Sequence, residues 1–273
     1  MTLYEQMLAE YGDVTGTKNP HAEQEVCQKI VLAGLSRGGF FKYAAFYGGT
    51  CLRLFHGLRR FSEDMDFTLT VKRDDIHLEN YFTAILEEFS LTGHKVEIEK
   101  KDKKLFGRVE SAFLKENSEV YNIKFQTRRM VKIKIEMDVD PPLGFTTENK
   151  LLLRPYSFTT RCVSLPDLYA GKMHALLYRA WQKRVKGRDW YDFEWYVRNN
   201  TPLNLGHLQA RIKEFNGDDI TEESFREMLH NKIACTDINL VKQDVEHFVD
   251  DPRELEIWST DYFLQLADSI RLV

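Results

Sequence analysis

The sequence lacks several features that define whole classes of protein. No apolar run approaches the ~20 residues that a membrane-spanning helix needs, and the N-terminus (MTLYEQMLAEYGDV) has acidic residues in place of the apolar core of a secretory signal. The cysteines form no CxxC pair, so the ligand spacing of a zinc site is missing. We therefore expect a cytoplasmic protein with no membrane contact, whose cysteines are all small buried hydrophobes. These cysteines are Cys27, Cys51, Cys162 and Cys235.

An overall excess of positive charge is also missing. The formal net charge is −4, whereas proteins that coat nucleic acids are usually basic. The charge is nevertheless uneven, because residues 172–188 contain six Lys or Arg, residues 121–134 contain five, and neither segment contains Asp or Glu. Local positive charge on an acidic chain favours a binding site for a polyanion.

The apolar periodicity of residues 1–160 predicts a mixed α/β domain with an antiparallel or mixed sheet. Helical spacing alternates with short strands and then gives way to a period of two residues. Pro141 and Pro142 end the last strand, because proline cannot donate to a sheet ladder. Helices are expected at 23–37, 50–58 and 75–90, and strands at 40–49, 65–71, 95–100, 104–114, 119–126 and 130–139.

Residues 161–273 have an almost entirely helical pattern. Ser164 and Asp167 resemble a capping box that opens a helix reaching about Val185, and Gly187 separates this helix from the next. Three or four further amphipathic helices are expected before the C-terminus. We therefore assign the chain to the α+β class, with an α/β domain at 1–160 and a helical domain at 161–273.

The most informative motif is the acidic pair Asp64 and Asp66. Two residues apart on an expected strand, both side chains should project from one face. Carboxylates this close repel each other unless a cation lies between them, and hard oxygen ligands suit Mg²⁺ or Mn²⁺ better than zinc. Upstream, Gly48, Gly49 and Thr50 offer backbone amides and a hydroxyl to a triphosphate.

A third carboxylate would complete a metal site, and the strand at 130–139 offers two candidates. Lys134, Glu136 and Asp138 alternate with apolar residues and should share one face of the sheet. Glu136 is the first choice because it lies in the middle of the strand, and Asp138 is the alternative. Either carboxylate could instead pair with Lys134.

These motifs resemble those of a known family. The sequence Gly-Gly-Thr followed by R-F-S-E-D-M-D-F is similar to the signature of the abortive-infection toxin nucleotidyltransferases (AbiEii/AbiGii type). These enzymes belong to the DNA polymerase beta-like nucleotidyltransferase superfamily. The later stretches S-L-P-D-L-Y-A-G-K-M-H-A-L-L-Y-R and R-D-W-Y-D-F resemble the family's lysine motif and Arg-Asp motif.

The resemblance implies specific roles for individual residues. Asp64 and Asp66 match the metal-binding pair, and Glu136 would complete the metal site. Lys172 matches a lysine that contacts the triphosphate, and Asp189 matches an aspartate that is essential for transfer; both would be contributed by the helical domain. Nucleotide-binding roles are implied for Gly48, Gly49, Thr50, Arg60, Ser62 and Lys172.

The expected function is therefore that of a metal-dependent nucleotidyltransferase and toxin. It would transfer a nucleoside monophosphate from a nucleoside triphosphate to RNA, at the 3′ end of tRNA, with release of pyrophosphate. The resemblance also implies a separately encoded antitoxin as partner. Two alternatives remain open: nucleotidylation of a protein hydroxyl, and a non-catalytic protein that binds nucleotide or RNA.

Overall fold

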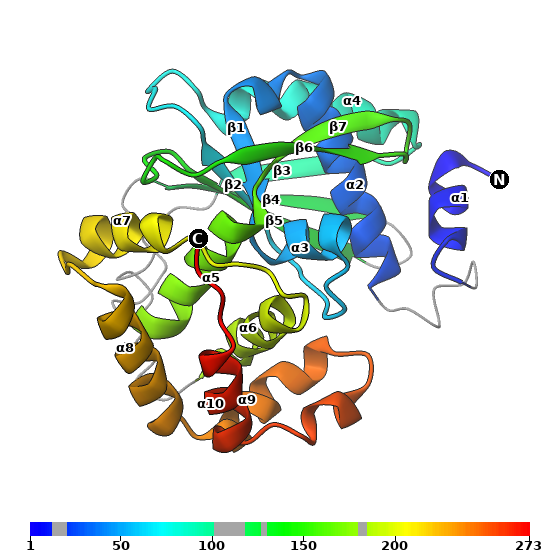
Figure 1. Ribbon diagram of the computed structural model, residues 1–273. Helices are drawn as coiled ribbons and strands as arrows, with labels where there is room; N and C mark the ends of the chain where they lie inside the picture. The colour runs from blue at the N-terminus through cyan, green and yellow to red at the C-terminus, as the bar shows by residue number, and fades with distance from the viewer. Residues whose placement is uncertain (13–20, 101–117, 127–129, 180–184) are drawn as a thin grey trace. The chain divides into compact units, whose positions relative to one another are not determined.

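The computed structural model describes residues 1–12, 21–100, 118–126, 130–179 and 185–273 (Figure 1). The chain forms two compact units. The first, here called the sheet unit, comprises residues 1–51, 63–143 and 147–162; the second, the helical unit, comprises residues 52–62, 144–146 and 163–273. Across the described ranges, no helix is both long enough and apolar enough to cross a membrane.

A mixed seven-stranded sheet forms the sheet unit, which confirms the predicted fold class. The strand order is β3-β4-β5-β2-β1-β7-β6; β2 pairs with β5 and β1 with β7 in parallel, whereas β1–β2, β3–β4 and β4–β5 are antiparallel. The strands are β1 (Ala44–Tyr47), β2 (Met65–Leu69), β3 (Val96–Lys100), β4 (Ser118–Gln126), β5 (Met130–Asp138), β6 (Thr147–Leu152) and β7 (Phe158–Val163).

Two strands were not predicted, and one prediction cannot be compared. The sequence analysis assigned no strand to β6 or β7, although β7 pairs with β1 and β6 forms one edge of the sheet. The strand expected at 104–114 lies outside the described residues. The alternation predicted for β5 is confirmed, since Ile133, Ile135 and Met137 are fully buried while Lys134 and Glu136 are half-exposed.

Helices α2 and α4 pack against each other on one face of this sheet (Figure 1). The predicted helix at 23–37 is confirmed as α2, whereas the helix expected at 75–90 begins with a 3₁₀ turn and becomes α-helical only at Phe82. Phe40, Phe46 and Phe67 meet edge-on or tilted in the core beneath them. The helices are α1 (Leu3–Ala9), α2 (Ala22–Arg37), η1 (Phe40–Lys42), α3 (Gly48–His56), η2 (Leu78–Tyr81) and α4 (Phe82–Leu91).

The helical unit is built almost entirely from helices, as predicted. Its elements are α5 (Leu165–Tyr178), α6 (Gly187–Arg198), α7 (Leu205–Asn216), α8 (Glu222–Ala234), α9 (Ile238–Val245), η4 (Glu246–Phe248), η5 (Pro252–Leu255) and α10 (Thr260–Asp268). Trp190, Phe193, Trp258 and Phe263 fill its core. The buried carboxylate of Glu194 accepts a hydrogen bond from the indole of Trp258 at 2.9 Å, which satisfies both groups inside the core.

The start and the end of α5 differ from the prediction. Ser164 is the N-cap residue but forms no capping-box hydrogen bond; its hydroxyl donates to Asp167, which also accepts hydrogen bonds from Thr146 and Asn204. The predicted capping box is therefore wrong. The helix ends at Tyr178 rather than near Val185, because the backbone of the next residue is already extended.

Two smaller features of the helical unit bear on the predictions. Gly187 does not separate helices but is the first residue of α6, and a Cβ atom there would collide with the backbone carbonyl of Val241 on α9. Glycine is therefore required for α6 and α9 to approach each other. Cys235 is exposed directly after α8, so the prediction that all four cysteines are buried is wrong for this one.

Candidate active site

The acidic residues of the sheet unit meet across the parallel pair β2 and β5. Asp66 and Glu136 are register partners, so their side chains leave the same face of neighbouring strands. Asp64 lies one residue before β2 begins, which corrects the expectation that both aspartates are within the strand. This face of the sheet therefore brings Asp66 on β2 and Glu136 on β5 together, with Asp64 directly before β2.

A lysine lies among these carboxylates. The ammonium group of Lys134 forms an ion pair with Glu136, and its Nζ lies 3.9 Å from Oδ2 of Asp64. Burial by itself would lower the pKa of Lys134, but the negative charges of Glu136, Asp64 and Asp66 outweigh burial and raise the pKa. The carboxylates thus create a local potential that holds a positive charge.

The alternative third carboxylate, Asp138, is placed differently from Glu136. Its register partner on β2 is Thr68, which lies two residues after Asp66 and on the same face of the sheet. The Asp138 side chain is buried and accepts a hydrogen bond from the backbone amide of Asp140 at 3.3 Å. The register therefore favours Glu136 as the partner of the acidic pair.

The glycine pair predicted to bind phosphate begins α3 directly after β1, and this junction lies beside Asp66. Gly48 has a φ of +82°, and a Cβ atom at this position would collide with the Asp66 carboxylate. Only glycine allows this junction to approach the acid so closely. Thr50 is fully buried, and its hydroxyl donates to the backbone carbonyl of Asp64. The junction thus supports the acidic pair, while the nucleotide contacts of Gly48, Gly49 and Thr50 stay predictions.

The donors on this sheet face suit a hard divalent cation in their chemistry, since all are carboxylate oxygens. Their oxygen atoms do not all lie within 4.8 Å of one another, as the ligand atoms of one ion would. In the described part of the chain, the group whose ligand atoms all lie within 4.8 Å of one another is a different one, His77, Glu79 and Glu119. The ammonium of Lys134 lies between the predicted ligands Asp64 and Glu136 and supplies a positive charge there, as a bound cation would.

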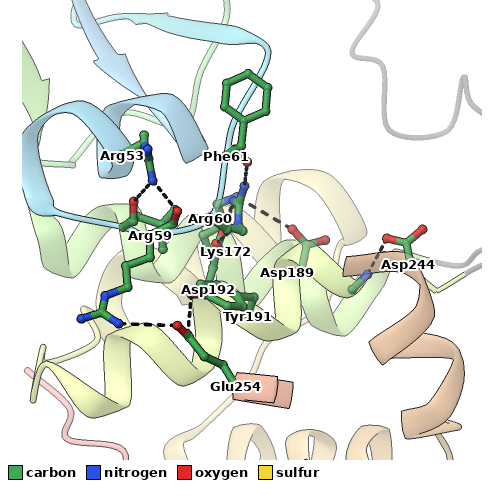
Figure 2. Close-up of polar contacts among 12 residues, drawn as sticks. Arg53, Arg59, Arg60, Phe61, Lys172, Asp189, Tyr191, Asp192, Asp244 and Glu254 are labelled. Carbon is green, nitrogen blue, oxygen red and sulfur yellow. Dashed lines mark hydrogen bonds and ion pairs between the residues drawn. The ribbon is translucent and has the colours of Figure 1, made fainter. Parts of the chain in front are cut away.

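The helical unit contains a second charged cluster, which is buried. The Arg60 guanidinium binds both carboxylate oxygens of Asp192, with N–O distances of 2.5 and 2.7 Å. The ammonium of Lys172 lies 2.6 Å from the same carboxylate, and Figure 2 shows Arg60 and Lys172 converging on Asp192. Arg60 and Asp192 have exposed fractions of only 2% and 0%, so this ion pair is shielded from solvent.

Asp189 extends the cluster along α6. It is paired with Arg179 at 2.8 Å and lies 3.8 Å from the Lys172 ammonium. Burial tends to raise the pKa of Asp189, but Arg179, Lys172 and Lys186 outweigh it and lower the pKa. Conversely, burial lowers the pKa of Lys186 to about 8.

The sequence analysis missed the central acid of this cluster. Asp192 lies three residues after Asp189 on α6, so the two carboxylates share one face of the helix. The spacing within R-D-W-Y-D-F is the signal that could have identified it. Arg60 and Ser62, which were predicted to bind nucleotide, are both buried, and the Arg60 guanidinium is bonded to Asp192 and to the Phe61 carbonyl.

The two basic segments are only partly described. Arg128, Arg129, Lys183 and Arg184 lie outside the described residues. Within the described part of 121–134, Lys124 pairs with Glu99 at 2.6 Å and Lys132 is exposed. The prediction that these segments bind a polyanion is therefore untested for most of their arginines.

Comparison with known proteins identifies the family. The sequence matches the family described as "Nucleotidyl transferase AbiEii toxin, Type IV TA system" over residues 30–266. The comparison with curated proteins gave no match. Among solved structures, the chain resembles MenT4, a nucleotidyltransferase toxin from Mycobacterium tuberculosis H37Rv, with a TM-score of 0.55 and 15% identity over 97% of this chain and 93% of that chain.

A second similar structure is JHP933 from Helicobacter pylori, with a TM-score of 0.53 and 17% identity over 92% of this chain and 91% of that chain. At such low identity these structures show a shared fold alone. The family match covers most of the chain and includes both charged clusters. The protein therefore belongs to the AbiEii family of nucleotidyltransferase toxins of type IV toxin–antitoxin systems.

Proposed function

We propose that this nucleotidyltransferase transfers a nucleoside monophosphate from a nucleoside triphosphate to RNA, with the 3′ end of tRNA as acceptor. The observation that carries the proposal is the register of β2 and β5, which sets Asp66 beside Glu136 with Asp64 two residues away. Three carboxylates on or directly before these strands, beside the glycine pair, form a suitable site for a triphosphate and its cation.

In this proposal, Asp64, Asp66 and Glu136 hold Mg²⁺ or Mn²⁺. When bound, the cation neutralises charge on the triphosphate and on the leaving pyrophosphate. The carboxylates fix its position because their strands are hydrogen-bonded to each other and the Asp64 backbone is tied to Thr50. Gly48 keeps the approach to Asp66 open, since any side chain there would collide with its carboxylate.

Lys172 is the proposed phosphate contact, because its ammonium is a compact charge that stays 19% exposed. Arg60 holds Asp192, and Asp192 in turn orients Lys172. Arg60 therefore acts through its neighbours, while Gly49, Thr50 and Ser62 remain proposed nucleotide contacts.

The reaction is an in-line displacement at the α-phosphorus. The acceptor hydroxyl oxygen forms the new P–O bond, the bond to the β-phosphate oxygen breaks, and pyrophosphate leaves. We assign acceptance of the hydroxyl proton to Glu136, because a lowered pKa makes Asp189 a weak proton acceptor. Asp189 acts instead as a fixed negative charge that positions Lys172 and Arg179.

An RNA acceptor is supported by charge. Residues 172–188 carry six Lys or Arg and no acid, and they include both Lys172 and the flank of Asp189. A polyanionic acceptor needs phosphate contacts near its reactive hydroxyl, which these residues offer. Membership of a type IV toxin–antitoxin family further implies a cognate antitoxin as protein partner.

The test is to incubate the protein with each of four labelled triphosphates, Mg²⁺ or Mn²⁺, and either total RNA or total protein. Labelled RNA whose sequenced 3′ ends carry extra nucleotides, with the modified molecules being tRNA, is the expected result. Asp66→Asn is the matched control and should give no label. Label in protein alone would support the alternative acceptor, and the absence of label in every combination would refute nucleotidyl transfer from these substrates.

A further inference from the structure

A buried amide lies in the same row of side chains as the proposed metal ligands. Asn122 on β4 is the register partner of Lys134 on β5, and Lys134 lies 3.9 Å from Asp64 beside β2. Register partners project from the same face of an antiparallel pair. This sheet face therefore carries, in order, the buried Asn122 amide, the Lys134 ammonium and the Asp64 carboxylate.

Asn122 is unusual within this row. Its side chain is only 4% exposed, yet its carbonyl oxygen Oδ1 has no hydrogen-bond partner among the residues that the structure describes. A buried acceptor without a donor destabilises the folded state, because the atom has lost its hydrogen bonds to water and gained none. Such atoms are therefore rare in folded proteins. The cross-strand neighbour that could donate to it is Lys134, whose ammonium is instead paired with Glu136.

We propose that Lys134 is a positioning residue that exchanges partners: its ammonium neutralises Asp64 and Glu136 in the cation-free enzyme and moves to Oδ1 of Asn122 when a divalent cation binds these carboxylates. This inference rests on the proposed function, because it assumes that Asp64, Asp66 and Glu136 are the cation ligands. The ammonium and a divalent cation would compete for the same carboxylate oxygens, because like charges repel at this short distance. A lysine side chain has the rotatable bonds needed to move between neighbouring strands.

The exchange has two measurable consequences. Lys134 competes with the divalent cation, so the lysine lowers cation affinity while it stabilises the cation-free enzyme. Asn122 receives the displaced ammonium, so it raises cation affinity, but only when Lys134 is present. The second consequence distinguishes an exchange from a purely structural role for either residue.

The experiment measures Mn²⁺ affinity by electron paramagnetic resonance and by calorimetry in the full-length protein without substrate. Lys134→Met should bind Mn²⁺ about tenfold more tightly, because a positive charge a few ångströms from the ligands is removed. It should also melt at a lower temperature without Mn²⁺, and saturating Mn²⁺ should reverse this loss. Lys134→Gln provides the same test if the methionine variant does not fold.

The control for overall charge is Lys132→Met. Lys132 lies two residues earlier on β5, on the same face, and is exposed. The substitution Lys132→Met removes the same charge at a position further from the carboxylates, so the Mn²⁺ affinity should change less than about twofold. An equal gain in affinity for Lys132→Met and Lys134→Met would show a general charge effect and overturn the proposal.

A double-mutant cycle tests the role of Asn122. Asn122→Leu, which keeps the volume and removes the amide, should weaken Mn²⁺ binding about threefold or more in the wild-type background. In the Lys134→Met background the same substitution should have no effect on Mn²⁺ affinity. An undiminished effect in that background would contradict the exchange; Asn122→Ala repeats the cycle if the leucine variant is unstable.

Failure of this inference can be separated from failure of the proposed function. If Asp66→Asn leaves Mn²⁺ affinity unchanged, the carboxylates are not the cation site and both proposals are wrong. If Asp66→Asn abolishes binding while Lys134→Met leaves the affinity unchanged, the cation site stands and the exchange alone is refuted.

Discussion

The two charged clusters of the protein differ in sign, in exposure and in the way their acids are paired. In the described part of the sheet unit, three half-exposed carboxylates lie near the ammonium of Lys134. In the helical unit, two buried carboxylates face four cations. The cations are Arg60, Lys172, Arg179 and Lys186.

The difference teaches that similar residue types can serve opposite purposes. An excess of carboxylates at a partly exposed surface attracts a cation, whereas an excess of cations around buried carboxylates attracts a polyanion. The acids of the helical unit, Asp189 and Asp192, have pKa values lowered by their cationic neighbours despite burial. We therefore expect substitutions in the sheet cluster to affect the reaction and substitutions in the helical cluster to affect folding as well.

The largest expected effect is the loss of nucleotidyl-transfer activity in the Asp66→Asn variant. Loss of a cation ligand should reduce the rate of transfer by about a thousandfold or more. Without metal, the melting temperature should stay level or rise, because one of the repelling carboxylates has been neutralised. Asp64→Asn should behave similarly. Activity close to wild type in either variant would show that the acidic pair is not the metal site.

The second prediction concerns the free energy of unfolding of Asp192→Asn. This substitution leaves the Arg60 guanidinium buried without its charged partner, which should cost about 3 kcal/mol. Chemical denaturation measures the loss, and Asp66→Asn is the matched control with no loss. The comparison between the clusters fails if both variants are equally stable. Replacing Arg60 and Asp192 together by leucine should recover much of the stability.

A third prediction separates Lys172 from Asp189. Lys172→Met should raise the KM for the triphosphate roughly tenfold, since a direct phosphate contact is lost. Asp189→Asn should raise KM in the same direction but less, because Asp189 acts only by positioning Lys172 and Arg179. Steady-state kinetics over a range of triphosphate concentrations measures KM in both variants. Equal losses of triphosphate binding in the two variants would mean that the roles are divided wrongly.

The smallest expected effect is the pH dependence caused by Lys186. Its pKa is lowered to about 8 in the folded protein, from the usual 10.5. Between these values the unfolded chain binds more protons at this residue, so its contribution to stability rises with pH; below pH 8 both states are protonated. Lys186→Met should therefore be more stable than wild type at pH 7, by on the order of 1 kcal/mol after allowance for solvent screening.

The measurement for Lys186 is denaturant unfolding at several pH values from 7 to 10. The difference between Lys186→Met and wild type should narrow as the pH rises above 8, where the wild-type lysine loses its proton. The exposed Lys213, substituted in the same way, controls for the loss of one positive charge. A difference that stays constant across this range would show that the pKa of Lys186 is not lowered in the folded protein.

Local patterns in the sequence were sufficient for many elements. Alternation identified the buried and open faces of β5, and helical spacing identified α2, because these periods follow from backbone geometry alone. The two-residue spacing of Asp64 and Asp66 likewise placed both acids on one side. Local patterns were insufficient where contacts between remote segments decide the local structure. They did not predict that α5 ends before Arg179, whose guanidinium binds Asp189. They also did not predict β6 and β7, which are strands only as part of the sheet.

The tertiary structure alone decided which distant residues meet. The register of β2 against β5 sets Asp66 beside Glu136 and leaves Asp138 beside Thr68, and no sequence period encodes that register. Burial and shape complementarity in the helical unit brought Arg60 to Asp192, although 132 residues separate them. The sequence by itself thus determined which chemistry the side chains offer, whereas hydrogen-bond register and packing decided which charges became neighbours, because both depend on contacts between remote segments.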